Sequence, residues 1–132
     1  MIEPCLIGCR ILVVEDDFFI RIDLESILRD AGAEVIGPCR GIADALELLT
    51  KSQVTAAILD MQLGHETVVP VARELTKRGT PFIFYSGQHG VDPALVEWSS
   101  HPILDKPALP RAIVGAVADL LPRHARDVRL SE

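Results

Sequence analysis

The sequence predicts an α/β fold in which a five-stranded parallel sheet is doubly wound, with helices on both faces. Five short, nearly continuous apolar runs alternate with stretches in which apolar residues recur at helical spacing. Strands that are apolar throughout are buried on both faces, and helices must then cover both sides of a parallel sheet. The chain has 132 residues, of which 48% are hydrophobic, enough for one domain with its own core.

The amino-terminal part of the chain predicts two strands and two helices. Residues 11–15 (ILVVE) form a continuous apolar run, as expected for a buried strand. Apolar residues at helical spacing across 20–31 predict the first helix, which Gly32 ends. Residues 33–37 (AEVIG) predict a short second strand, and an i, i+3, i+4, i+7 pattern across 42–49 predicts the second helix.

The middle of the chain continues this alternation. A third strand is expected at about 54–60, followed by a helix around 66–78. Pro70 fits this helix only in its first turn, because proline has no backbone N–H to donate. Residues 81–86 (PFIFYS) predict the fourth strand.

The last part of the chain supplies two helices and one strand. Asp92 and Pro93 are a suitable N-cap and first residue for a short helix. Residues 102–105 (PILD) predict the fifth strand, and apolar residues at helical spacing within 113–121 predict the closing helix.

Composition and charge exclude several functional classes. A net charge of −6 with scattered basic residues argues against binding to nucleic acid. No apolar run approaches the roughly 20 residues that span a bilayer. Three cysteines outside any C-x-x-C motif suggest free thiols in a reducing compartment, and the four histidines lack zinc-ligand spacing. We therefore expect a cytoplasmic protein without nucleic-acid or membrane partners.

The predicted strand ends carry the residues with chemical potential. Ligands of open parallel sheets bind beyond the carboxyl ends of the strands. The polar residues expected at this edge are Glu15, Asp16, Asp17, Asp60, Ser86, Gly87 and Lys106. Of the acids, Asp17 is expected to be structural, as the cap of the first helix. Two carboxylates about 5 Å apart repel by roughly 3 kcal/mol at an effective dielectric of 20, so such a cluster calls for shifted pKa values or a cation. Mg²⁺ suits it, because this ion prefers oxygen ligands and accepts a phosphate.

Asp60 is the candidate nucleophile of this cluster. A carboxylate beside a metal site and Lys106 can accept a phosphoryl group, which gives an aspartyl phosphate. The chain has neither G-x-x-x-x-G-K-[ST] nor G-x-G-x-x-G, so the phosphoryl group is expected from another protein or a small donor. Taken alone, Asp60 also suits a helix N-cap. Its neighbours Glu15, Asp16 and Lys106 favour the chemical interpretation.

Four segments together resemble the response-regulator receiver domains of two-component signalling, in particular the standalone, chemotaxis-regulator-like members. They are ILVVEDD, AAILDMQLG, FIFYSG and LDKP, in this order. The resemblance covers about residues 9–121 and implies one receiver domain over 1–132 with a tail at 122–132. It also implies a flavodoxin-like sheet of order 2-1-3-4-5 flanked by five helices.

The resemblance assigns a magnesium site at the strand ends. Asp60 would be the phosphoacceptor and would contribute to metal binding. Asp16 would bind Mg²⁺ directly, and Glu15 would act on the metal mainly through water. The main-chain carbonyl of Gln62 would complete the ligands from the protein.

The resemblance also assigns the residues that hold the phosphoryl group. Lys106 would pair with the phosphoryl oxygens, and the Ser86 hydroxyl would move to donate a hydrogen bond to them. Gly87, which follows Ser86 at the same strand end, would be part of the phosphate-binding site. A cis peptide is implied between Lys106 and Pro107.

Some positions depart from the commonest family pattern. Ile103 occupies the position of an aromatic residue that turns inward on activation in many members. PFIFYSG is similar to the Phe-Ala-Thr-Gly-x-Tyr signature of receivers associated with stress phosphorelays, but Tyr85, Ser86 and His89 differ from it.

The function expected is that of a receiver that takes a phosphoryl group onto Asp60 from a histidine kinase or histidine phosphotransfer protein. It would hydrolyse its acyl phosphate slowly, as a switch and not as a metabolic enzyme. The surface formed by the fourth helix, fifth strand and fifth helix would change its arrangement and bind an unknown downstream protein. A second copy of the chain is the other candidate partner for this surface, which would give a homodimer. The alternative is a phosphorylation-independent interaction module, which Ile103 favours mildly. An aspartate-nucleophile phosphatase lacks its second acid, because position 62 is Gln.

Overall fold

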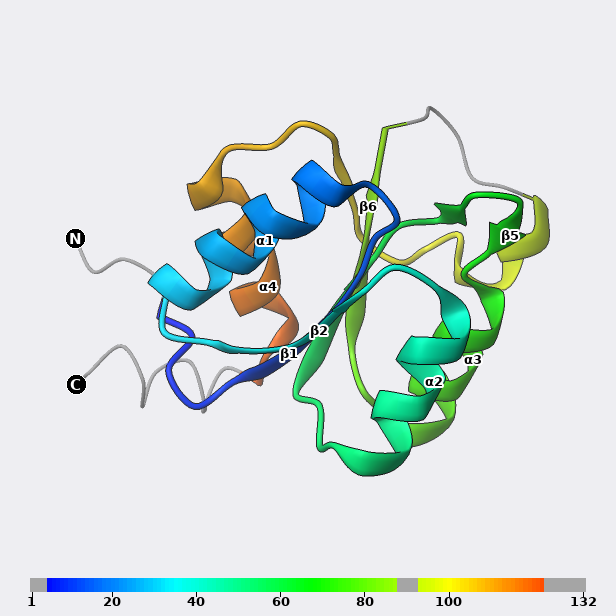
Figure 1. Ribbon diagram of the computed structural model, residues 1–132, viewed down its shortest axis with the longest axis horizontal. Coiled ribbons are helices and arrows are strands. Elements are labelled where there is room, and N and C mark those ends of the chain that lie inside the picture. Colours follow the sequence, from blue (N-terminus) through cyan, green and yellow to red (C-terminus); the bar gives the residue numbers. More distant parts are fainter. Residues whose placement is uncertain (1–4, 88–92, 123–132) are drawn as a thin grey trace.

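The computed structural model describes residues 5–87 and 93–122, which form a five-stranded parallel sheet with helices on both faces (Figure 1). In spatial order the strands are β2 (Glu34–Cys39), β1 (Arg10–Val14), β3 (Ala56–Leu59), β6 (Phe82–Ser86) and β7 (Ile103–Asp105). The expected fold class and the strand order 2-1-3-4-5 are therefore confirmed.

The helices divide between the two faces of the sheet. They are α1 (Phe18–Asp30), α2 (Ile42–Lys51), α3 (Val69–Arg78), the 3-10 helix η1 (Pro93–Trp98) and α4 (Pro110–Leu120). One core cluster joins the sheet to α2, α3 and η1, and the other joins it to α1 and α4. Figure 1 shows α1 and α4 on one side of the strands and α2 and α3 on the other.

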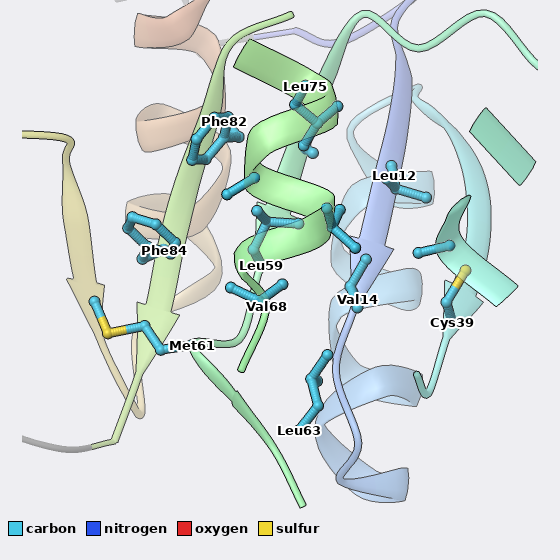
Figure 2. Packing of buried hydrophobic residues seen from close by; sticks show 14 of the residues in the cluster. Leu12, Val14, Cys39, Leu59, Met61, Leu63, Val68, Leu75, Phe82 and Phe84 are labelled. Carbon is cyan, nitrogen blue, oxygen red and sulfur yellow. The ribbon is translucent and has the colours of Figure 1, made fainter. Parts of the chain in front are cut away.

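Residues of β1 alternate between the two core clusters, which explains its continuous apolar run. Leu12 and Val14 pack on the α2–α3 side, as Figure 2 shows, whereas Ile11 and Val13 pack on the α1–α4 side. All four are fully buried. A strand covered on both faces has no polar positions in its centre, so polar residues appear only where it ends.

The helix after β3 begins three residues later than expected, and a hairpin precedes it. Gln62–Leu63 (β4) and Glu66–Thr67 (β5) form a small antiparallel hairpin, and α3 begins only at Val69. A helix beginning near residue 66 would need Pro70 to donate its N–H within the helix, and proline has none. With the later start, Pro70 lies in the first turn of α3.

Two helix starts were predicted from capping residues. The Asp17 side chain accepts a hydrogen bond from the Ile20 N–H at 3.0 Å, which confirms it as the N-cap of α1. The predicted N-cap Asp92 lies outside the described residues. The short helix expected there is a 3-10 helix that begins at Pro93. Further along the chain, the peptide bond between Lys106 and Pro107 is cis, as expected.

The carboxyl ends of the strands meet at one edge of the sheet. In the strand register Val14 is paired with Leu59, and Ser86 with Asp105. The residues that directly follow β1, β3 and β7 are therefore neighbours in space; they are Glu15, Asp60 and Lys106. We call this edge the rim.

Within the described part of the chain, no helix has the length and apolar character needed to cross a membrane. Cys5, Cys9 and Cys39 are free thiols, as expected. Burial, with a smaller contribution from Asp44, raises the pKa of Cys39 to about 11, so this thiol stays protonated at neutral pH.

Candidate functional site

Three carboxylates gather at the rim. Glu15, Asp16 and Asp60 each offer an oxygen, and these oxygens all lie within 4.8 Å of one another. Glu15 and Asp60 are only 1% and 8% exposed, whereas Asp16 is exposed to solvent. The site therefore has two buried acids and a third that solvent can reach.

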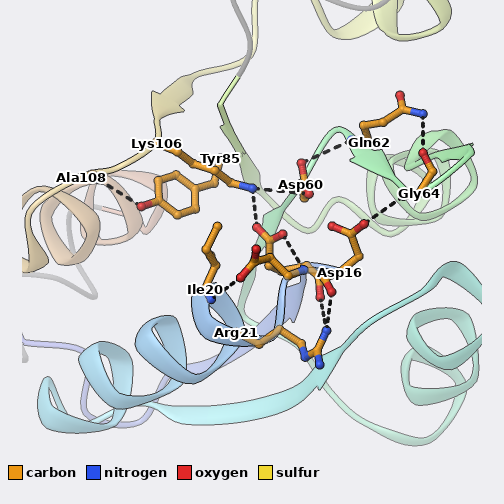
Figure 3. A network of polar contacts seen from close by, with 11 residues as sticks. Asp16, Ile20, Arg21, Asp60, Gln62, Gly64, Tyr85, Lys106 and Ala108 are labelled. Atoms are coloured by element: carbon orange, nitrogen blue, oxygen red, sulfur yellow. Dashed lines mark hydrogen bonds and ion pairs between the residues drawn. The ribbon is translucent and has the colours of Figure 1, made fainter.

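Lys106, which directly follows β7, joins this acidic cluster. Its Nζ lies 2.6 Å from Glu15 Oε1 and 3.4 Å from Asp60 Oδ2, and Figure 3 shows its side chain extended toward Asp60. Burial by itself would lower the pKa of Lys106, but the carboxylates of Glu15 and Asp60 outweigh it and raise this pKa. Lys106 is therefore a fixed positive charge at the site.

Asp60 is held in an environment that disfavours its charge. Burial, followed by a hydrogen bond and repulsion from Glu15, raises the pKa of Asp60 from 3.8 to about 7. The charge of Lys106 and the Gln62 N–H, which donates to Asp60 Oδ1 at 3.3 Å, act in the opposite direction. A bound cation would favour the carboxylate over the neutral acid.

The loop after β1 is shaped by hydrogen bonds to its backbone. Arg21 Nη1 donates to the main-chain oxygens of Glu15 at 3.1 Å and Asp16 at 2.9 Å. The Asp17 N–H donates to Glu15 Oε2 at 3.1 Å. These bonds fix the acids relative to the start of α1.

The β4–β5 hairpin closes the other side of the cluster. The Gly64 N–H donates to Asp16 Oδ2 at 3.0 Å, so the hairpin turn is tied directly to an acid. The Gln62 side-chain amide donates to the Gly64 oxygen at 3.1 Å, as drawn in Figure 3. Gln62 thus uses its side chain to brace the turn.

The fourth strand end lies beside Lys106. Ser86 is the last residue of β6, is 4% exposed, and its main-chain oxygen accepts the Lys106 N–H at 2.8 Å. A Cβ on Gly87 would lie 3.7 Å from Lys106 Cδ, so Gly87 borders the stem of this lysine. Ile103 lies on β7, paired with Phe84, and is 38% exposed.

The structure brings together Glu15, Asp16, Asp60 and Lys106, four of the residues singled out in the sequence. Gln62, Ser86 and Gly87 border this group, and the roles of the Gln62 carbonyl and the Ser86 hydroxyl remain predictions. Sequence reasoning missed Arg21 and Gly64. A signal was available for Arg21 alone, since it is a charged residue one turn after the N-cap Asp17.

Replacing Arg21 with methionine should lower the free energy of unfolding by about 2 kcal/mol. The substitution keeps an apolar stem but removes the charged donor shared by two main-chain oxygens. Urea unfolding measures the change. Arg29→Met is the control in the same helix: its partner is Glu25 at the surface, so a loss of about 0.5 kcal/mol or less is expected. Equal losses for both variants would contradict a special role for Arg21.

Comparison with known proteins agrees with this geometry. The family model of the response regulator receiver domain matches residues 11–118. The transcriptional regulatory protein YbdJ from Bacillus subtilis is 32% identical over 120 residues, which cover 89% of this chain and 52% of that protein. The transcriptional regulatory protein PdtaR from Mycobacterium tuberculosis is 31% identical over 75 residues, 56% of this chain and 37% of that protein. The match thus spans about half the length of these relatives, or less.

Solved structures show the same fold. SdrG from Sphingomonas melonis is 34% identical with a TM-score of 0.74, and the match covers 85% of this chain and 95% of SdrG. A response regulator receiver protein from Sinorhizobium medicae is 29% identical with a TM-score of 0.70, covering 89% and 96%. The response regulator PhyR from Brucella abortus is 22% identical with a TM-score of 0.73, covering 89% and 49%. From the family match, the fold and the acidic rim, the chain belongs to the response regulator receiver domains.

Proposed function

We propose that this receiver accepts a phosphoryl group on Asp60, with Mg²⁺ bound, from a histidine kinase or a histidine phosphotransfer protein. The observation that carries the proposal is the position of the Asp60 carboxylate. It lies at the end of β3, with two further acids within 4.8 Å and the Lys106 ammonium at 3.4 Å. An acid in this setting has both a cation site and a counter-charge for a phosphoryl group.

The donor set fits a hard divalent cation. The three candidate ligands are carboxylates, and the Lys106 ammonium, which contacts two of them, leaves an excess of negative charge. Mg²⁺ takes one or two carboxylates together with water and phosphate oxygens. We propose Asp16 and Asp60 as direct ligands, Glu15 as a ligand mainly through water and the Gln62 carbonyl as a further ligand. The bound ion would neutralise charge on the incoming phosphoryl oxygens.

In the transfer step, an Asp60 carboxylate oxygen attacks phosphorus and forms a new P–O bond. The P–N bond of the donor phosphohistidine breaks, and its electron pair stays on the imidazole, which binds a proton as it leaves. Lys106 would hold a phosphoryl oxygen by charge, and the Ser86 hydroxyl would donate to another. Attack of water on the acyl phosphate would later return Asp60 and inorganic phosphate.

A protein donor is supported by apolar residues beside the rim. Phe18, Phe19 and Ile22 are 57%, 79% and 50% exposed and lie on α1, which starts two residues after Asp16. Exposed apolar groups gathered in this way are typical of protein contact surfaces. We propose that the phosphohistidine protein docks over the start of α1.

The free thiols are consistent with a cytoplasmic location.

Output would use the surface formed by η1, β7 and α4. It carries the exposed apolar residues Val96, at 68%, and Ile103, at 38%. A phosphoryl group at the rim adds charge beside Lys106 and can bias this surface toward a second arrangement. A downstream protein or a second copy of the chain would bind there.

Phosphorylation is tested by incubating the protein with acetyl phosphate and Mg²⁺ and measuring its mass. One added phosphoryl group is expected, and Asp60→Asn should abolish it. Asp105→Asn is the matched control, because Asp105 ends β7, another strand of the same sheet, and is exposed. Full labelling of Asp60→Asn would refute the proposal.

A further inference from the structure

Tyr85 contacts the segment that carries Lys106, although it belongs to the core. It is the penultimate residue of β6 and is 5% exposed, packed in the cluster between the sheet and α1 and α4. Its hydroxyl reaches out of this cluster and accepts the Ala108 N–H at 3.1 Å (Figure 3). A buried tyrosine hydroxyl usually has such a partner.

The Tyr85 ring also lies close to the lysine itself. Lys106 Nζ is 5.6 Å from the centroid of the ring, within the range of cation–π attraction. The same ammonium contacts Glu15 Oε1 at 2.6 Å and Asp60 Oδ2 at 3.4 Å. The ammonium therefore has an aromatic ring and two carboxylates around it.

The backbone around Lys106 is anchored on both sides by consecutive residues of β6. The Lys106 N–H donates to the Ser86 oxygen at 2.8 Å, and two residues later the Ala108 N–H donates to the Tyr85 hydroxyl. Ala108 belongs to the segment after β7, where strand hydrogen bonds have ended. The Tyr85 hydroxyl therefore binds this segment to β6 at a point where the backbone pairing of β6 with β7 has already ended.

We propose that Tyr85 is a positioning residue that holds Lys106 at Asp60. The hydroxyl fixes the chain that follows Lys106, and the ring limits where the ammonium can lie. The inference rests on the proposed phosphoryl transfer to Asp60. It assigns a chemical role to a residue that is otherwise an ordinary member of a buried strand.

Tyr85→Phe tests the hydroxyl alone, because phenylalanine keeps the ring and its packing. We expect phosphorylation by acetyl phosphate to slow by roughly three- to tenfold, the effect of losing one neutral hydrogen bond. The dissociation constant for Mg²⁺ should stay unchanged, because Glu15, Asp16 and Asp60 provide those contacts. If Tyr85 had a purely structural role, the substitution would lower the melting temperature but would not slow phosphorylation selectively at an unchanged dissociation constant for Mg²⁺.

A double-mutant cycle with Lys106→Met shows whether Tyr85 acts through the lysine. Tyr85→Phe should slow the reaction in the wild-type background and have no further effect when Lys106 is absent. An equal slowing in both backgrounds, or an unchanged rate in the single variant, would overturn the inference.

Failure of the proposed function can be distinguished from failure of this inference. If the wild-type protein gains no phosphoryl group, the proposed function fails. The positioning role is then judged by NMR of the unphosphorylated protein: the Lys106 side-chain resonances should shift, and Ala108 amide exchange should accelerate, in Tyr85→Phe. Unchanged Lys106 resonances would overturn the positioning role independently of any phosphorylation.

Discussion

Replacing Lys106 with methionine is expected to slow phosphorylation of Asp60 by about two orders of magnitude, because a preorganised charge at the transferred group typically contributes 10² to 10³ in rate. Methionine keeps most of the length of the stem but removes the ammonium that lies 3.4 Å from Asp60. Initial rates with acetyl phosphate at saturating Mg²⁺ measure the effect. A rate within twofold of wild type would show that Lys106 does not stabilise the transferred group.

The same substitution should destabilise the metal-free protein by about 3 kcal/mol. Glu15 is 1% exposed and would lose the ammonium that contacts it at 2.6 Å, which leaves a buried charge without its partner. Mg²⁺ should recover part of the loss, since it would supply another positive charge to the cluster. Lys51→Met is the control: its pair with Glu47 lies at the surface, and a change below about 0.5 kcal/mol is expected.

The residues with the clearest chemistry could be predicted from the sequence because the fold itself brings them together. Glu15, Asp60 and Lys106 each directly follow a strand of the sheet, and parallel strands end at a common edge. Once the apolar runs are assigned to strands, the topology of the sheet predicts that these three residues lie close together. This prediction needs no knowledge of side-chain positions.

The supporting contacts could not be predicted in the same way. Arg21 reaches back to two main-chain oxygens of the loop before α1, and its reach depends on the path of that loop. Gly64 meets Asp16 because a hairpin, which was not predicted, forms between β3 and α3. Tyr85 follows the apolar pattern of its strand, and nothing local indicates that its hydroxyl meets Ala108. Such contacts depend on loop geometry, which residue spacing does not determine.

Asp60→Asn should stabilise the metal-free protein at pH 8 while it abolishes phosphorylation. The pKa of Asp60 is 3.8 in its ordinary state and about 7 in the folded protein. Between these values the folded protein holds a proton that the unfolded chain releases, so stability falls as pH rises from about 4 to 7. Above pH 7 the full cost of the buried charge is present, and asparagine removes it.

The gain at pH 8 should be on the order of 2 kcal/mol after allowance for screening of the rim by solvent. It should be nearly absent near pH 3.5, where Asp60 is protonated in the folded protein and mostly protonated in the unfolded chain. Thermal unfolding at the two pH values measures it, with Asp105→Asn as the control that leaves stability unchanged. Saturating Mg²⁺ should reduce or reverse the gain, because asparagine removes an anionic ligand for the ion. A gain in stability that is independent of both pH and Mg²⁺ would mean that asparagine stabilises the protein by packing. The buried charge of Asp60 would then not be what destabilises the folded protein.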